Sequence, residues 1–219
     1  MHLPQGANHS SMIAREGFPF IIPLAAVTII AFLAGYTWLC AVLFLLTLFV
    51  LWFFRNPERE TPEGQRVVTS PADGKVIRIE ETTSDELPGI PFRKISVFMN
   101  VFNVHVNRIP CAGEVFSIRY RAGKFLSANL DKASELNERN IVLIRMPDGR
   151  EIITVQIAGV IARRIVCWLK EGMQVQKGER FGLVRFGSRL EVFLPLGTKI
   201  LVRLGDKVRA GETPIGELT

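Results

Sequence analysis

Residues 18–54 read FPFIIPLAAVTIIAFLAGYTWLCAVLFLLTLFVLWFF and contain no charged side chain. A bilayer core is about 30 Å thick, so one helix needs about 20 apolar residues to cross it. This stretch is nearly twice that length, and two short helices over 18–34 and 37–54 with a turn near Gly35 fit it better. We therefore expect a helical membrane hairpin, either spanning or dipping into one leaflet. A buried soluble hairpin is disfavoured, because the stretch lacks a polar stripe.

The flanks of this stretch predict how the hairpin is oriented. Residues 1–17 form a tail with one Arg and one Glu. A cleaved signal peptide is a poor fit, because it would begin with a net positive charge and carry a shorter apolar run. Arg55, Arg59 and Arg66 follow the stretch closely, whereas only Arg15 precedes it. Because positive flanks favour the cytoplasm, we expect the rest of the chain on the cytoplasmic side of the cell membrane.

Composition restricts the partners of residues 55–219. Of the 219 residues 48% are apolar, which excludes a disordered chain, and the net charge of +6 falls entirely after residue 54. A tethered basic domain suits anionic phospholipid headgroups. Nucleic acid is not expected, because no basic cluster is interleaved with aromatic residues. Cysteine and histidine are too few and scattered for a disulfide framework or a metal site: Cys40, Cys111, Cys167, His2, His9 and His105.

After Pro57 the sequence changes to short β-like runs separated by Gly and Pro. These runs are 75–80, 93–101, 113–120, 140–146, 151–159, 189–195 and 198–205. The Asp148-Gly149 pair predicts a hairpin turn, and a helix is plausible over 158–169. We expect a mainly β fold (α+β) with short helices.

A short motif, G-x-x-V-x-x-G-E, occurs at 172–179 and again at 205–212. Its glycines can adopt positive φ at turns, and its valine can pack inward. Such pairs occur in pseudo-symmetric β-sandwiches of the biotinyl/lipoyl-carrier type, which is the core we expect. Asp131-Lys132-Ala133 matches the tripeptide that carries lipoyl groups, but its polar flanks are unlike a hairpin tip, so we expect Lys132 to be unmodified.

Three residues are candidates for chemistry, although each has an ordinary alternative. His105 is the one histidine after the tail, and a lone histidine in a strand is more often structural. Asp73 precedes a glycine, as turn formers do, and Ser188 follows Gly187 as in many loops. Neither a P-loop nor a G-x-S-x-G nucleophile motif is present.

The combination of segments is more specific than any one of them. In order they are FFRNPER (53–59), SPADGKV (70–76), FMNVFNVHVNR (98–108), NERN (137–140), IAGVIARRIVC (157–167), KGERFGLVRFGS (177–188) and GDKVRAGETPIG (205–216). This series resembles the phosphatidylserine decarboxylase proenzymes, in their short membrane-anchored form, over residues 53–219. They are pyruvoyl-dependent lyases of phospholipid biosynthesis.

The resemblance implies an autocatalytic zymogen. The chain would be cleaved between Gly187 and Ser188 into an associated large chain 1–187 and small chain 188–219, and Ser188 would become a covalent pyruvoyl group, the one cofactor required. His105 would act as the base and Asp73 as its partner. The pyruvoyl ketone would form a Schiff base with the amine of phosphatidylserine and accept electrons as carbon dioxide leaves, giving phosphatidylethanolamine. No metal is implied, and a homo-oligomer is compatible with it.

Two further expectations concern the substrate and one departure from the family. Phe98, Met99 and Phe102 are candidates to receive acyl chains, or else they are core strand residues. Many relatives have a second histidine at the position of Phe102, so a role for it cannot apply here. Alternative functions are decarboxylation of a related phosphoserine lipid such as archaetidylserine, or a membrane-anchored, lipoyl-like carrier or adaptor without catalysis.

Overall fold

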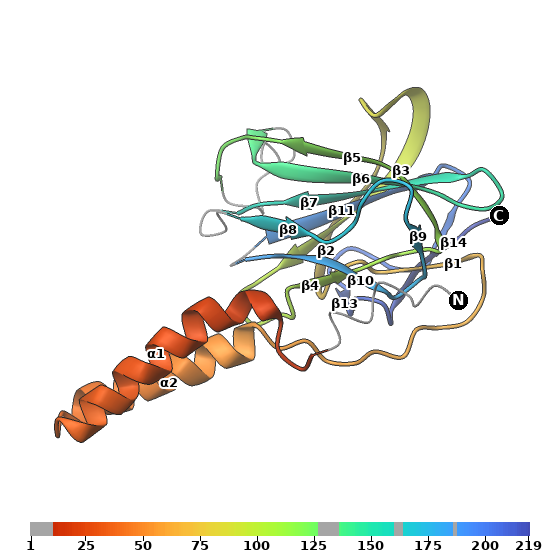
Figure 1. The fold of residues 1–219 in the computed structure, drawn as a ribbon. Helices are drawn as coiled ribbons and strands as arrows, with labels where there is room; N and C mark the ends of the chain where they lie inside the picture. Colours follow the sequence, from red (N-terminus) through yellow and green to blue (C-terminus); the bar gives the residue numbers. More distant parts are fainter. Residues whose placement is uncertain (1–10, 127–135, 160–163, 186–187) are drawn as a thin grey trace. The chain divides into compact units, whose positions relative to one another are not determined.

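The computed structural model describes residues 11–126, 136–159, 164–185 and 188–219. The chain divides into two units, Met1–Glu58 and Arg59–Thr219 (Figure 1). The first holds the helices and the second holds the strands, so the described chain is mostly β.

The first unit is a helical hairpin. A short 3₁₀ helix, η2 (Arg15–Gly17), leads into α1 (Phe18–Leu33), and α2 (Thr37–Phe53) follows a turn in which Gly35 has a φ of 77°. Both helices and the turn lie where the apolar run predicts them.

The contact between α1 and α2 includes one polar pair. Thr28 and Thr47 are buried, and their hydroxyl oxygens lie 3.4 Å apart. Each hydroxyl also hydrogen bonds the carbonyl four residues earlier in its own helix. The polar groups are thus satisfied inside the hairpin, as an apolar solvent would require.

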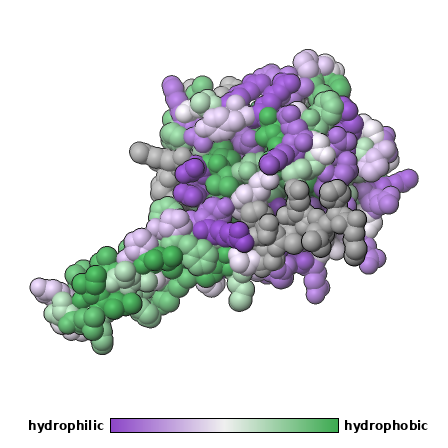
Figure 2. Space-filling model, in the orientation of Figure 1, coloured by the Kyte–Doolittle hydropathy of each residue, from purple (hydrophilic) through white to green (hydrophobic). Residues whose placement is uncertain are grey.

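The outer surface of the hairpin is apolar. Figure 2 shows hydrophobic residues covering the helices, and Trp38 and Leu33 are 87% and 77% exposed. The helical stretch Arg15–Leu33 is long and apolar enough to cross a membrane, whereas the apolar helix Thr37–Phe53 is shorter. At about 1.5 Å per residue, α2 is about 25 Å long.

The second unit contains fourteen strands within the described residues. They are β1 (Val67–Thr69), β2 (Gly74–Ser84), β3 (Leu87–Met99), β4 (Val106–Arg108), β5 (Gly113–Arg121), β6 (Arg139–Arg145), β7 (Glu151–Ile157), β8 (Ile165–Cys167), β9 (Gln174–Val175), β10 (Arg180–Val184), β11 (Ser188–Pro195), β12 (Lys199–Ile200), β13 (Lys207–Val208) and β14 (Pro214–Glu217).

These strands form one large and two small antiparallel sheets. The large sheet has the order β13-β2-β3-β11-β7-β6-β5-β9, and the small ones are β1-β14-β12 and β4-β10-β8 (Figure 1). The predicted hairpin at Asp148-Gly149 joins β6 to β7, and Gly149 has a φ of 85°. The mainly β prediction is confirmed.

One predicted element is wrong. The helix expected over 158–169 is replaced at Ile165–Cys167 by strand β8, which pairs with β10. Residues 160–163 lie outside the described part. The β-branched Ile165 and Val166 favour an extended strand once a partner strand is beside them.

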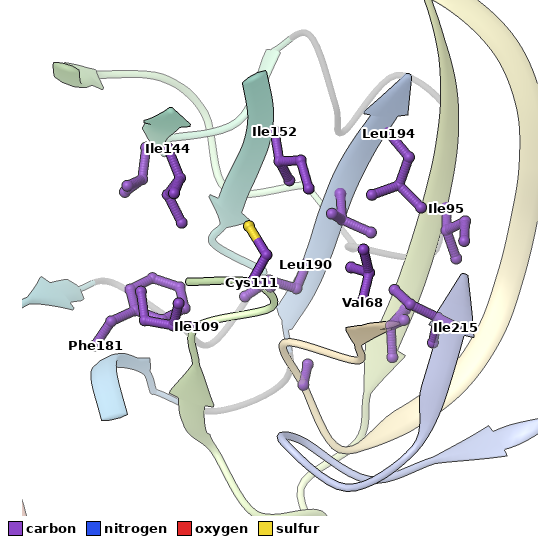
Figure 3. Packing of buried hydrophobic residues seen from close by; sticks show 14 of the residues in the cluster. Val68, Ile95, Ile109, Cys111, Ile144, Ile152, Phe181, Leu190, Leu194 and Ile215 are labelled. Carbon is purple, nitrogen blue, oxygen red and sulfur yellow. The ribbon is translucent and has the colours of Figure 1, made fainter. Parts of the chain in front are cut away.

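The main core lies between the large sheet and the small sheets. Val68, Ile95, Leu190 and Ile215 come from β1, β3, β11 and β14, and Figure 3 shows these side chains packed within one cluster. All four are fully buried. Leu190 lies on the strand that begins with Ser188, so core packing fixes the backbone of the candidate nucleophile.

The two copies of the G-x-x-V-x-x-G-E motif form matching turns at opposite edges of the large sheet. Val175 and Val208 are buried and belong to the edge strands β9 and β13. The four glycines of the two copies have φ between 74° and 94°, which favours a residue without Cβ. The inward valines and the positive-φ glycines confirm what the motif predicts.

A second repeat matches the first, since SPADGKV at 70–76 corresponds to IPCAGEV at 109–115. Gly74 lies opposite Val208, and Gly113 lies opposite Val175. A Cβ on Gly74 or Gly113 would lie 2.2 or 2.4 Å from a backbone carbonyl oxygen, so both positions require glycine.

The two halves also bond to each other reciprocally. Thr69 N donates to Pro110 O, and Arg108 N donates to Pro71 O. The corresponding bonds within each half match as well, because Gly211 N donates to Ser70 O while Gly178 N donates to Ile109 O. The strand unit is therefore built from two similar halves related by an approximate two-fold axis.

Candidate active site

Ser188 opens β11, a central strand of the large sheet. It lies opposite Met99 of β3 and is fully buried. Its Oγ has no hydrogen-bond partner within the part of the chain that the structure describes. An unpaired buried hydroxyl costs stability, so such a group is unusual unless it has a function. Gly187, the other residue of the predicted cleavage site, lies outside the described residues.

His105 follows a turn that its own amide residues hold together. Asn103 Oδ1 accepts a bond from Asn100 N, and Asn100 Oδ1 accepts one from Phe102 N, both at 2.9 Å. The His105 ring is 2% exposed, and its Nδ1 lies 2.9 Å from Asn103 O. Because a carbonyl can only accept, Nδ1 is the donor in this contact, and Nε2 is the ring nitrogen left to exchange a proton with a reacting group.

Asp73 precedes β2 and is 8% exposed. Its Oδ2 lies 2.9 Å from Arg59 Nη2, and its Oδ1 accepts a 2.8 Å bond from Ala210 N. The orienting contact on His105 Nδ1 comes from Asn103, while Asp73 is held by Arg59 and Ala210. The pairing of Asp73 with His105 stays a prediction.

Strand pairing, one side-chain contact and one backbone hydrogen bond connect the three segments. Met99, opposite Ser188, receives a long 3.7 Å bond on its sulfur from Asn107 Nδ2 in the strand that follows His105. The next residue, Arg108, donates through its amide to Pro71, two residues before Asp73. Strand pairing and these contacts thus gather residues far apart in the sequence.

A network of three buried amide side chains borders this region. The sequence does not predict these contacts. Asn140 Nδ2 donates to Gln156 Oε1 at 3.0 Å, and Gln156 Nε2 donates to Asn107 Oδ1 at 2.9 Å. Gln156 lies opposite Leu190 on β11. A buried polar network is tolerated where its members satisfy one another, and it then fixes one arrangement. The NERN segment was the one sequence signal for it.

An ion pair lies on the strand immediately after Ser188. Arg189 Nε and Glu191 Oε1 are 3.2 Å apart, and these side chains are only 1% and 4% exposed. Ser96 Oγ donates to the same Glu191 oxygen. Burial lowers the pKa of Arg189, and the negative charge of Glu191 opposes that shift. The sequence alone does not reveal that Arg189 is buried.

The three residues proposed to receive acyl chains differ in accessibility. Met99 is fully buried in the main core, and Phe98 is partly buried. Phe102, on the turn before His105, is 65% exposed. Lys132 lies outside the described residues. Among the described residues, no group of three or more His, Cys, Asp or Glu side chains could hold a metal ion.

Comparison with known proteins identifies the family. The family model for phosphatidylserine decarboxylase matches residues 46–216. A phosphatidylserine decarboxylase proenzyme of Syntrophus aciditrophicus is 60% identical over 95% of this chain and 98% of its own length. Similar proteins of the same name from Magnetococcus marinus and Ruegeria pomeroyi are 47% and 50% identical over at least 93% of this chain and at least 94% of their own. The chain therefore belongs to the phosphatidylserine decarboxylase family.

Proposed function

We propose that this protein is a self-cleaving proenzyme that becomes a pyruvoyl-dependent phosphatidylserine decarboxylase. The observation that supports this most strongly is the Ser188 hydroxyl, which is fully buried and unpartnered among the described residues at the start of a central strand. A catalytic proenzyme needs a nucleophile aimed at its own backbone, and a solvated surface serine would not meet that need.

Maturation begins when Ser188 Oγ loses its proton and attacks the carbonyl carbon of Gly187. The peptide bond becomes an ester, with the Ser188 nitrogen as a free amine. β-Elimination then releases chain 1–187 as a carboxylate and leaves dehydroalanine at position 188. Addition of water and loss of ammonia convert that residue to a pyruvoyl group. With Nδ1 of His105 donating to Asn103 O, Nε2 is the proposed acceptor of the serine proton.

The residues present fit a pyruvoyl group. Because the buried Ser188 hydroxyl has no hydrogen-bond partner among the described residues, its replacement by a ketone would lose no hydrogen bond to them. When formed, this group supplies an electron sink for the carbanion left as carbon dioxide departs. His105 is the proposed donor that returns a proton to that carbon, since a histidine exchanges protons near neutral pH.

The substrate is a diacyl lipid, and removing it from the bilayer costs about 0.8 kcal/mol per CH₂. An enzyme tethered by an apolar hairpin would meet it at the membrane surface. Phe102 is exposed and three residues from His105, so it is the proposed contact with acyl chains. The positive flanks of the hairpin support a position on the cytoplasmic side.

Denaturing mass spectrometry tests this proposal directly. The purified wild-type protein should yield a chain of residues 1–187 and a chain of residues 188–219 with a blocked N-terminus. Ser188→Ala should leave one intact chain and abolish decarboxylation, while the control Ser117→Ala on β5 should mature normally. Normal turnover by Ser188→Ala would refute the role of Ser188. An intact, inactive wild-type chain would instead favour the carrier function.

The roles of the base and its neighbour are tested separately. His105→Ala should slow cleavage at least a hundredfold, as loss of a general base does, and Asp73→Asn should slow it as well. Cleavage time courses measured by gel electrophoresis give both rates. Efficient maturation of both variants would remove this pair from the mechanism.

A further inference from the structure

The two halves of the strand unit present turns with the same backbone but different surfaces. We call residues 201–209 the basic turn and residues 168–176 the matching turn. Asp206 N donates to Arg203 O in the former, and Met173 N donates to Lys170 O in the latter, both at 3.2 Å. The two turns therefore serve as natural controls for each other.

The exposed side chains of the two turns differ in charge and in apolar character. The basic turn carries Arg203, Lys207 and Arg209 against Asp206, a net charge of +2, and Leu204 is 64% exposed. The Asp206 carboxylate accepts a bond from the turn's own Arg203 N. The matching turn has no net charge, since it carries only Lys170 and Glu171. Leu204 corresponds to Glu171 in this comparison.

The basic turn lies beside the candidate site. Ala210, immediately after it, donates its amide proton to Asp73 Oδ1 at 2.8 Å. Val208 within it lies opposite Gly74. In the other half, the residue equivalent to Asp73 is Ala112. The half that carries the candidate carboxylate is thus also the half that carries the exposed basic and leucine side chains.

We propose that the basic turn is a docking surface for anionic phospholipid headgroups, which seats the strand unit on the leaflet next to its active site. This proposal rests on the proposed function for the purpose that docking would serve. The hydrogen-exchange test of docking does not require catalytic activity. Basic residues close to an anionic leaflet each strengthen binding about fivefold. An exposed leucine between them can enter the interface, as apolar residues of peripheral proteins do.

The uncleaved or cleaved full-length protein in nanodiscs allows a direct test. Amide hydrogen exchange would be followed in the basic turn and in the matching turn of the same molecules. We expect added protection in the basic turn alone when 30% phosphatidylglycerol replaces phosphatidylcholine, and loss of it at high salt. Equal protection of the two turns, or none, would overturn the proposal. Protection that rises with protein concentration in neutral nanodiscs would assign the turn to a contact between copies instead.

A charge-matched pair of variants adds a second measurement. Arg203→Gln, Lys207→Gln and Arg209→Gln together remove three positive charges from the basic turn. Lys170→Gln, Gln174→Glu and Gln176→Glu change the charge of the matching turn by the same amount at the same backbone positions. The first variant should raise KM on anionic bilayers about a hundredfold, because three contributions of about fivefold each are lost, and should leave activity on detergent-dispersed substrate unchanged, whereas the control should alter neither. Equal effects would contradict the proposal.

If the wild-type protein is uncleaved and inactive, the exchange measurement still decides the docking proposal. Failure of docking and failure of the proposed function are therefore distinguished. A difference between the two turns that persists in an inactive Ser188→Ala protein would support docking independently of catalysis.

Discussion

At the level of single residues, Arg59, which follows the apolar stretch and ends the FFRNPER segment, contacts two buried or partly buried carboxylates. Its two terminal nitrogens lie 2.9 Å from Asp73 and 2.9 Å from Glu212, and its side chain is 9% exposed. If one partner of a buried ion pair is removed, the remaining charge still pays the free-energy cost of desolvation without the compensating attraction. Arg59 therefore acts as a positioning residue for Asp73.

Replacing Arg59 tests this role. Arg59→Gln should lower the free energy of unfolding by about 2 kcal/mol, because it leaves the Asp73 carboxylate poorly compensated. It should also slow self-cleavage, and Arg59→Lys should restore part of the rate. Glu212→Gln, which removes the more exposed partner, is the control with a small effect. Cleavage in Arg59→Gln at the wild-type rate would show that Asp73 needs no such partner.

The buried thiol of Cys111 predicts that the free energy of unfolding depends on pH in the alkaline range. It is 1% exposed, and burial raises the pKa of its thiol from 9.0 to about 12. The folded state therefore holds this proton more tightly than the unfolded state. Its contribution to stability is complete below pH 9 and is lost between pH 9 and 12, at up to about 1.4 kcal/mol per pH unit.

Chemical denaturation between pH 8 and 11 would measure this slope. The difference in unfolding free energy between the wild type and Cys111→Ala should shrink as pH rises above 9. Cys40→Ala in the helical hairpin is the control, and its difference from the wild type should not follow that curve. A wild-type minus Cys111→Ala difference that is constant with pH would contradict the assignment.

At the scale of elements, the buried Arg189–Glu191 pair on β11 is expected to show strong coupling. Arg189→Met alone should destabilise the protein by about 3 kcal/mol, because Glu191 is left buried without its cation. Arg189→Met combined with Glu191→Leu should recover most of that loss, since an apolar pair needs no compensation. A double-mutant cycle by urea denaturation measures the coupling. Additive effects would show that the two side chains act independently.

The sequence predicts several elements because their signals are local. The apolar run and Gly35 are sufficient for α1, α2 and their turn, and Asp148-Gly149 is sufficient for the β6–β7 hairpin. Strand β8 was missed because its three residues are extended only through pairing with β10. The second repeat, at 70–76 and 109–115, shares only Pro, Gly and Val, and its meaning emerges once both glycines are seen against backbone carbonyls.

The candidate site was predictable residue by residue, but its supporting contacts were not. Ser188, His105 and Asp73 were chosen by resemblance, and the structure adds which segments meet. Asn103 contacts His105 from two residues away, whereas the contacts of Arg59 with Asp73 and of the Asn140–Gln156–Asn107 chain join residues 14 to 49 positions apart in sequence. Neither spacing nor composition encodes such contacts, since they depend on strand order and register.

At the level of the whole molecule, we expect the hairpin and the strand unit to have separable roles. All of the main core cluster lies between Val68 and Leu218. Removal of residues 1–54 should therefore leave self-cleavage intact while lowering partition into phospholipid vesicles and turnover of bilayer substrate at least tenfold. Vesicle sedimentation measures partition, and a detergent assay serves as the control. Unchanged partition would mean that the hairpin is not the anchor.

In the proposed function, residue 188 is converted from a serine to a ketone before the protein decarboxylates its substrate. A preparation whose decarboxylase activity has been measured can be denatured, and the mass of the small chain determined by mass spectrometry before and after reaction with an alkoxyamine. We expect a small chain of residues 188–219 with a blocked N-terminus and one alkoxyamine adduct, in proportion to the measured activity. An active preparation in which residue 188 remains an ordinary serine would contradict it.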